Sequence, residues 1–387
     1  MRKYQIISAD GHLEVPPERW TPWVASKFQD RVPRTQTMED GRDIVRMGDF
    51  EMPLGMVVRA DLDDDEFVDT NADHFHFADG TPRPGTGPAA QRLREQDYDG
   101  IDAEVLYPPV SGAKFLKNLL PSDPELYTAL VQGYNNWLAQ EYCATAPDRL
   151  IGGGIQLETG LEDSILEAER CKKMGLSWVL LANWPNGTPY YEPGDEKYFA
   201  ALADAGIVIS PHSNFGANAP RVGLTGAKGG GIESVLYHRA YGQTAYAISQ
   251  MIIQGIFDKV PNGKIYFAET YTSWLPITFN RMDEHYLRRS YYYNFRLRKL
   301  PSEYIRDHMA FSSIGERQAL PLRYYSGLDN MMWGSDFPHN VNTYPHSRAA
   351  LDEMFHGVSD EERRRVLVLN PCDWFGLDPD ADITPTP

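Results

Sequence analysis

The chain has 387 residues, 42% of them hydrophobic, which suffices for one large domain or two ordinary ones. Its formal net charge is −17, and so acidic a surface argues against nucleic-acid binding and against adhesion to anionic membranes. No apolar stretch approaches the roughly 20 residues needed to span a bilayer, and the first residues lack a signal-peptide layout. The widely spaced Cys143, Cys171 and Cys372 predict neither disulfides nor a thiolate metal site, so we expect a cytoplasmic protein.

Eight short apolar segments have the near-continuous hydrophobicity of parallel strands that are covered on both faces. We predict these strands at residues 4–9, 103–107, 150–157, 178–182, 207–211, 264–268, 309–311 and 331–334. Amphipathic helical patterns lie between most of them, at residues 123–146, 160–174, 196–205 and 241–257. This alternation predicts an α/β fold, a (β/α)8 TIM barrel. A doubly wound sheet is the alternative, but no glycine-rich dinucleotide signature follows the first strand.

Residues of about 30–95 interrupt the alternation with a stretch rich in Asp, Gly and Pro. We therefore predict a single domain, residues 1–387, that carries an insertion after its first strand, either a lid or an oligomer contact. Because strand-end loops shape the pocket of a TIM barrel, this insertion is expected to influence substrate choice.

Four metal-type side chains fall at predicted strand ends. Asp10 and His12 follow the first strand two residues apart, so they point the same way and offer a metal an oxygen and a nitrogen donor. His212 ends the fifth strand and Asp336 the eighth. Because TIM barrels gather catalytic residues at the carboxyl ends of their strands, we expect these four to converge. Taken singly, each has a plain alternative as a loop cap, a helix cap or a core histidine.

Further segments extend this pattern over nearly the whole chain, at residues 8–16, 94–108, 134–137, 146–150, 255–261, 269–283, 333–339 and 369–370. Together they resemble the amidohydrolase superfamily, and specifically the branch of aminocarboxymuconate-semialdehyde decarboxylase and related aromatic-acid decarboxylases. The resemblance implies a small-molecule substrate and a homodimer. It also implies Asp10, His12, His212 and Asp336 as the first to fourth ligands of a divalent metal.

A single metal is expected, because no lysine that could be carbamylated to bridge two metals follows the fourth strand, where Ala182-Asn-Trp-Pro185 stands. Two carboxylates and two imidazoles suit Zn²⁺, with Mn²⁺ as the alternative.

The sequence departs from the decarboxylase pattern after the sixth strand, where those enzymes carry a catalytic histidine and this chain has Phe267-Ala-Glu269. Glu269 could orient a ligand, take up a proton or serve as a structural acid. The nearest available imidazole is His238, between the fifth and sixth strands, which faces the pocket or starts a helix at the surface.

Because that histidine is missing, we expect hydrolysis of a small organic carbonyl substrate, aromatic or derived from ring cleavage, by a metal-activated water. Asp336 would accept the proton of this water, and His238 or Glu269 would protonate the leaving group. The alternative is non-oxidative decarboxylation of an aromatic or enol-type acid, and a third possibility is a metal-free barrel that binds a ligand.

Several other side chains are candidates for the pocket. Trp20, Tyr107, Trp184 and Trp274 lie near predicted strand ends or pocket loops and are candidates for stacking an aromatic substrate. His339, after Asp336, is expected to be structural or to line the pocket rather than to bind metal. Glu14 belongs to the opening motif and is expected to be structural or to support a ligand.

Overall fold

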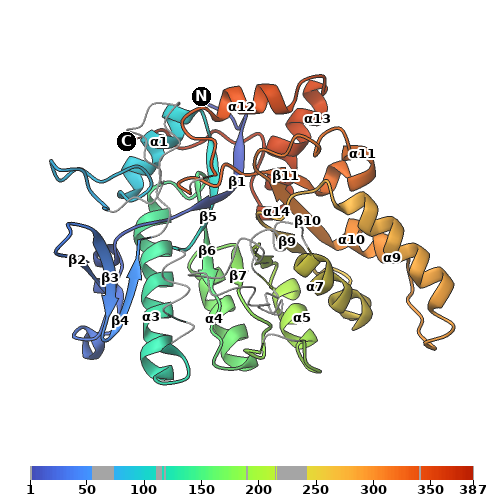
Figure 1. Cartoon of the computed structure of the whole chain (residues 1–387), viewed down its shortest axis with the longest axis horizontal. Helices are drawn as coiled ribbons and strands as arrows, with labels where there is room; N and C mark the ends of the chain where they lie inside the picture. The colour runs from blue at the N-terminus through green and yellow to red at the C-terminus, as the bar shows by residue number, and fades with distance from the viewer. Residues whose placement is uncertain are drawn as a thin grey trace.

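The computed structural model describes residues 2–54, 74–109, 116, 119–188, 191–213, 215, 242–339 and 341–386 (Figure 1). Eight parallel strands form one sheet in chain order, as predicted: β1 (Ile7–His12), β5 (Ala103–Tyr107), β6 (Leu150–Ile155), β7 (Trp178–Leu181), β8 (Val208–Pro211), β9 (Ile265–Phe267), β10 (Met309–Ser313) and β11 (Met331–Trp333). The first and last strands meet where Gly11 pairs with Phe337, so the sheet closes into the predicted (β/α)8 barrel.

Helices surround these strands (Figure 1). They are α1 (Ala89–Asp99), α3 (Pro124–Trp137), α4 (Leu161–Lys173), α5 (Glu196–Asp204), α7 (Gly242–Ile253), α8 (Ile256–Lys259), α9 (Leu275–Arg289), α10 (Pro301–His308), α11 (Arg323–Ser326), α12 (Ser347–Met354), α13 (Asp360–Arg364) and α14 (Asn370–Phe375). Within the described residues, none of them is long and apolar enough to cross a membrane.

The helix termini follow local chemistry. The Asp123 carboxylate accepts a hydrogen bond from the Leu126 backbone N–H, and Pro124 occupies the first helical position, so α3 begins where the sequence predicts. The range predicted as one helix at 241–257 contains α7 and α8 instead. Gly255, with φ +68°, separates them, because this left-handed conformation interrupts the helix and favours glycine.

Residues 34–53 of the expected insertion form a separate antiparallel sheet, seen at the left of Figure 1. Its strands are β2 (Arg34–Thr37), β3 (Asp43–Met47) and β4 (Phe50–Pro53). The expected end of the insertion, near residue 95, lies inside α1, which begins at Ala89 and leads into β5. The last residues of the range that the composition assigns to the insertion therefore belong to α1, the helix before the second barrel strand.

Aromatic side chains fill the barrel along its axis. The Tyr107 ring lies 4.5 Å from that of Trp178, which in turn lies 6.4 Å from Phe375 of α14. The Tyr266 hydroxyl donates to the Ala9 carbonyl at 2.8 Å, so this buried phenol is satisfied. The barrel is thus a packed core, and any pocket must form at the end where the strands terminate.

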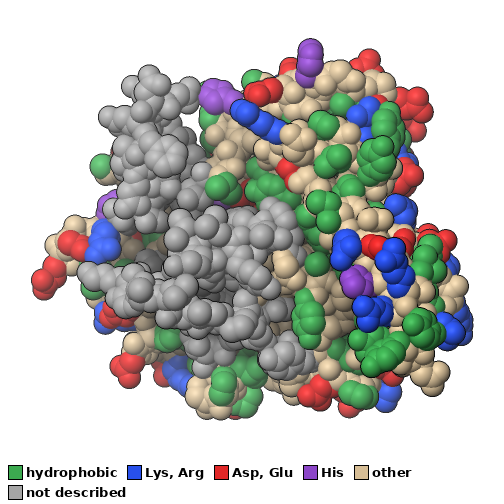
Figure 2. Space-filling model, turned by 45° about the vertical axis from the view of Figure 1, so that its right-hand side comes forward, with side chains coloured by type: hydrophobic (Ala, Val, Ile, Leu, Met, Phe, Trp, Pro, Cys, Tyr) green, Lys and Arg blue, Asp and Glu red, His purple; other side chains and the backbone are tan. Residues whose placement is uncertain are grey.

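Large apolar side chains are exposed on the outer helices. They belong to α9, to the turn after it and to α11: Ile277, Leu287, Tyr291, Tyr292, Tyr293, Tyr324 and Tyr325. Figure 2 shows hydrophobic side chains mixed with charged ones on the right-hand part of the face it draws. Such patches are common at protein contacts, but the homodimer expected from the family resemblance stays a prediction.

A buried ion pair supports the junction of the first and last strands. Arg92 of α1 donates to Glu104 of β5 at 2.7 Å and to the Phe337 carbonyl at 3.1 Å. Gln96 also donates to Glu104, at 2.8 Å. A side chain at position 11 would begin 2.9 Å from the guanidinium, so Gly11 lets β1 approach this pair. The ion pair therefore connects α1, β5 and the segment after β11.

Replacing Arg92 with Met leaves the buried Glu104 carboxylate without its cation. We expect the free energy of unfolding to fall by about 3–5 kcal/mol, measured by urea denaturation. The double variant Arg92→Met/Glu104→Gln should recover part of this loss, because no unpaired charge remains. A loss no larger than that of an exposed pair, about 1 kcal/mol or less, would contradict this role.

Candidate metal centre

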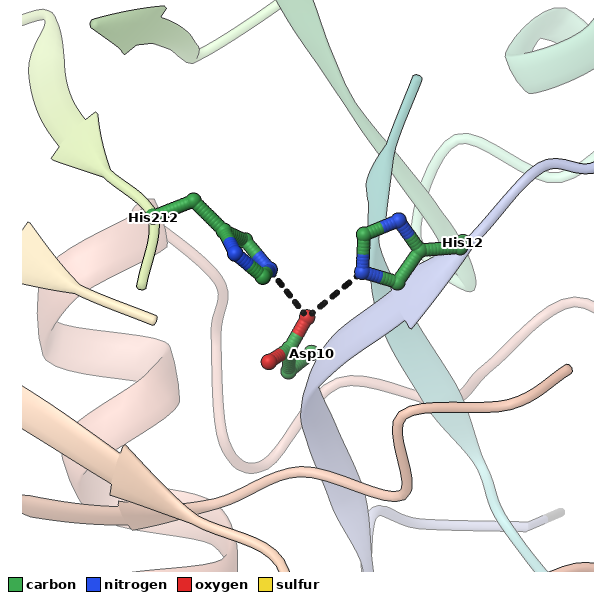
Figure 3. A group of neighbouring side chains, drawn as sticks. All are labelled: Asp10, His12 and His212. Carbon is green, nitrogen blue, oxygen red and sulfur yellow. Dashed lines mark ion pairs between the residues drawn. The ribbon is translucent and has the colours of Figure 1, made fainter. Parts of the chain in front are cut away.

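The four side chains predicted to converge lie together at the carboxyl ends of three strands. Asp10 and His12 come from the end of β1, His212 directly follows β8, and Asp336 follows β11. Figure 3 shows the Asp10 carboxylate between the two imidazoles. Asp10 Oδ1 lies 3.6 Å from His12 Nε2 and 3.5 Å from His212 Nε2. Asp336 Oδ1 lies 3.4 Å from His12 Nε2, which completes the cluster.

Local backbone features bring these side chains together. The register of β1 against β5 shifts between Ser8 and Gly11, and irregularities of this kind often re-aim side chains beside active sites. A Cβ at position 334 would lie 2.4 Å from Asp10 Cβ, so Gly334 is needed for the close approach of the last strand. Asp336 and Glu269 have φ of +59° and +51°, a left-handed conformation that is strained in residues other than glycine and is enriched at functional sites.

The polar atoms of this cluster lack ordinary partners. Both Asp10 carboxylate oxygens, His212 Nε2 and Asp336 Oδ2 are buried and have no hydrogen-bond partner among the described residues. Burying an ionised carboxylate without compensation is costly. A bound cation would give the buried Asp10 and His212 atoms a partner beside His12, so the residues present fit a divalent metal ion.

Two overlapping groups of donors have the spacing for such an ion. One consists of Asp10, His12 and His212, and the other of His12, Asp336 and His339, with the ligand atoms of each group within 4.8 Å of one another. Carboxylate oxygens and imidazole nitrogens together suit Zn²⁺ and Mn²⁺.

The electrostatics of the cluster reflect its burial. Burial, opposed by His339, raises the pKa of Asp336 to about 6. Burial lowers the pKa of His12 well below its ordinary value, and the charges of His339 and His212 act in the same direction. Burial also disfavours the charged form of His212, but Asp10 outweighs it and raises the pKa of that imidazole. His12 is therefore neutral, the form that binds metal, whereas the raised pKa values of Asp336 and His212 let protons compete with a metal for these two side chains as the pH falls.

Glu269 lies on the Nδ1 side of the His212 ring and contacts it through Ser213. Ser213 Oγ donates to Glu269 Oε2 at 2.9 Å and lies 3.1 Å from His212 Nδ1. Glu269 Oε2 itself is 3.7 Å from His212 Nδ1. This contact leaves His212 Nε2 directed at Asp10. His238, the other residue predicted to act on protons, lies outside the described residues.

Of the four aromatic candidates, one lies at the cluster. This is Tyr107, whose ring lies 4.9 Å from that of His212 and 5.6 Å from that of His12. Trp20 packs on an aromatic ring of α3, and Trp184 is fully buried among aromatic side chains that include one from α5. Trp274 donates its indole N–H to a backbone carbonyl at 2.7 Å. The assignment of these three tryptophans to substrate stacking stays a prediction.

Glu14 and His339, which the sequence predicts in structural, supporting or pocket-lining roles, lie beside Asp336. His339 Nδ1 lies 2.9 Å from Asp336 Oδ1, and its Nε2 lies 3.4 Å from Glu14 Oε1. The signal for Glu14 in the sequence is its place in the opening motif at residues 8–16, on which its expected structural or supporting role rests. For His339 no periodic signal existed, because it lies in a turn stabilised by a hydrogen bond from its own backbone N–H to the Asp336 carbonyl.

Comparison with known proteins places the fold and this cluster in context. A sequence model of the amidohydrolase family matches residues 73–377. The chain belongs to the amidohydrolase family. This amidohydrolase is 26% identical over 294 residues to a 2-amino-3-carboxymuconate-6-semialdehyde decarboxylase of Dictyostelium discoideum, a match that covers 74% of this chain and 76% of the relative. The resemblance seen in the sequence motifs is thereby confirmed.

Two crystal structures share its fold. An amidohydrolase from Mycobacterium avium subsp. paratuberculosis matches with a TM-score of 0.72 and 20% identity, covering 98% of this chain and 99% of that one. A 5-carboxyvanillate decarboxylase from Novosphingobium aromaticivorans, complexed with manganese and 4-hydroxy-3-methoxy-5-nitrobenzoic acid, matches with a TM-score of 0.61 and 22% identity, covering 74% and 80%. The barrel of this amidohydrolase is thus shared along nearly its whole length.

Binding of Mn²⁺ to the amidohydrolase should weaken as the pH falls. Asp336 is protonated below its raised pKa of about 6, and His212 also gains a proton. We expect the apparent affinity to drop by about tenfold per pH unit for each proton that the metal displaces. Titrations at several values between pH 7.5 and pH 5 measure this slope. The Asp336→Asn variant should show a shallower slope, and a flat profile for the unmodified protein would contradict the assignment.

Proposed function

We propose that this amidohydrolase is a decarboxylase of a small aromatic or enol-type carboxylic acid and depends on one divalent metal ion. Asp10, His12, His212 and Asp336 would hold the ion. The proposal rests on the buried cluster of oxygen and nitrogen donors at the barrel mouth, in a chain related to a decarboxylase over three-quarters of its length. The manganese complex of the 5-carboxyvanillate decarboxylase supports Mn²⁺ before Zn²⁺.

Decarboxylation takes precedence over the hydrolysis expected from the sequence. That expectation depends on the missing histidine after β9, but the curated relative is a decarboxylase. Glu269, which stands at this position, contacts Ser213 and approaches His212, so its carboxylate fits the role of orienting a metal ligand. Glu269 therefore need not act as an acid that protonates a leaving group.

The reaction replaces the carboxyl group of the acid by a proton and releases CO₂. A bound divalent cation supplies a positive charge that stabilises the negative charge developing during C–C cleavage. Tyr107 and the aromatic side chains beneath it close the floor of the site against water from the barrel interior. The Glu269–Ser213 contact holds the His212 ring so that Nε2 faces the centre. His238, which the sequence predicts as a leaving-group acid of hydrolysis, is here a candidate donor of the proton to carbon, and it lies outside the described residues.

Product analysis in ¹⁸O-labelled water distinguishes the two reactions. We incubate the Mn²⁺-loaded protein with a panel of hydroxylated aromatic acids that includes 5-carboxyvanillate and follow the products by mass spectrometry. Decarboxylation predicts a product lighter by the mass of CO₂ and free of the label. Solvent oxygen in a new carboxylate would refute decarboxylation and favour hydrolysis.

The Asp336→Asn variant should keep its fold and lose at least about 100-fold in kcat/KM, because one carboxylate of the metal site is removed without a change of shape. Asp99→Asn is the matched control. Asp99 is also a buried carboxylate, but it accepts a hydrogen bond from the Ser347 backbone N–H at 2.8 Å, outside the cluster. Equal activity of the Asp336 variant and the control would remove Asp336 from the site.

A further inference from the structure

His339 lies between two buried carboxylates. Its exposed fraction is 5%, that of Glu14 is 2% and that of Asp336 is 1%. The Nδ1 atom of His339 is 2.9 Å from Asp336 Oδ1, and the Nε2 atom is 3.4 Å from Glu14 Oε1. Each nitrogen of the His339 imidazole thus faces a buried carboxylate. The proposed function does not assign a role to His339.

The hydrogen-bonding roles follow from the partners. An ionised Asp336 can only accept, so His339 Nδ1 must carry a hydrogen and donate it. The other ring nitrogen, Nε2, faces Glu14 Oε1 at 3.4 Å. Glu14 therefore fixes the orientation of the imidazole, and the imidazole fixes one oxygen of Asp336.

The backbone of Asp336 is already immobilised. Its N–H donates to the Asp10 carbonyl at 2.9 Å, and its carbonyl accepts from the His339 N–H at 2.8 Å. The remaining freedom is rotation of the carboxylate. With Oδ1 bonded to His339, the second oxygen, Oδ2, is buried and has no hydrogen-bond partner among the described residues.

His339 also contacts a second candidate ligand. Its ring centroid lies 3.9 Å from that of His12, with 32° between the ring planes. The His339 ring therefore packs against His12 while it bonds to Asp336. One side chain thus limits the motion of two of the four proposed ligands.

We propose that Glu14 and His339 form a positioning pair that orients Asp336 toward the divalent cation and supports the ring of His12. The inference rests on the metal site of the proposed function and is independent of which reaction the site performs. It assigns metal affinity, and not only folding, to the two side chains.

Two substitutions of His339 separate its two contacts. The amide nitrogen of His339→Asn takes the place of Nδ1, so this variant can still donate to Asp336 but does not reach Glu14. The amide of His339→Gln takes the place of Nε2, so it reaches Glu14 and leaves Asp336 without its donor. Dissociation constants for Mn²⁺ are measured at pH 7.5 by the electron paramagnetic resonance signal of the free ion.

We expect His339→Gln to weaken Mn²⁺ binding by about 10- to 100-fold, the usual range for partners of metal ligands. His339→Asn keeps the donor to Asp336 but loses the contact with Glu14, so it should weaken binding less than His339→Gln does, an order that a merely structural role would not produce. Circular dichroism checks folding. Glu14→Gln, which leaves His339 in place, provides a second measurement and should weaken binding less than His339→Gln.

The outcomes are distinct. Equal affinities of the unmodified protein, both His339 variants and Glu14→Gln would overturn the positioning pair while leaving the metal site intact. An unmodified protein that binds no Mn²⁺ would overturn both the pair and the metal site. A protein that binds Mn²⁺ with the expected order of affinities but decarboxylates none of the acids would support the pair and contradict only the proposed reaction.

Discussion

Two buried carboxylates at the junction of the first and last barrel strands are the constraint on which this structure depends. Asp10 and Asp336 are held close together because the Asp336 N–H donates to the Asp10 carbonyl at the point where the barrel closes. A buried carboxylate in its ionised form disfavours the folded state unless a cation or hydrogen bonds compensate its charge. The same backbone contact therefore closes the fold and brings together buried donors that could hold a metal.

Residues around the junction of the first and last strands allow its close packing and stabilise it. Gly334 and Gly11 remove side chains where the strands crowd against Asp10 and Arg92. Asp336 itself adopts a left-handed backbone conformation, whose cost is on the order of 1–3 kcal/mol. The buried pair of Arg92 and Glu104 lies behind the junction and bonds to the Phe337 carbonyl. Strain at the mouth of the barrel is thus offset by contacts outside it.

The sequence predicts the barrel well because its signals are local and repeated. All eight strands appear within a few residues of their apolar segments, and the first strand carries Asp10 and His12 on one side through its period of two. Strand-end placement likewise brings His212 and Asp336 to the same edge. These features need no knowledge of long-range contacts.

Other features depend on such contacts and were therefore not predictable. The pairing of His339 with Glu14 joins residues more than three hundred positions apart through a turn with no periodic pattern. Trp20 and Trp184, candidates for substrate stacking, have rings that pack against other aromatic side chains, contacts that chain position alone does not predict. Proximity along the chain to a strand end does not determine which way a loop side chain turns.

The residue at the end of β9 shows why one substitution cannot identify a reaction. Reading Glu269 as a lost histidine favours hydrolysis, because a decarboxylase of this family then lacks its acid. In the structure Glu269 is joined to His212 through Ser213, which gives its carboxylate a supporting role that is compatible with either reaction. The identity of a side chain limits which protons it can carry, but its partners determine whether it faces the substrate or a ligand of the metal. The chemistry of the site therefore depends on which group delivers a proton to carbon, a separate question from why the histidine is absent.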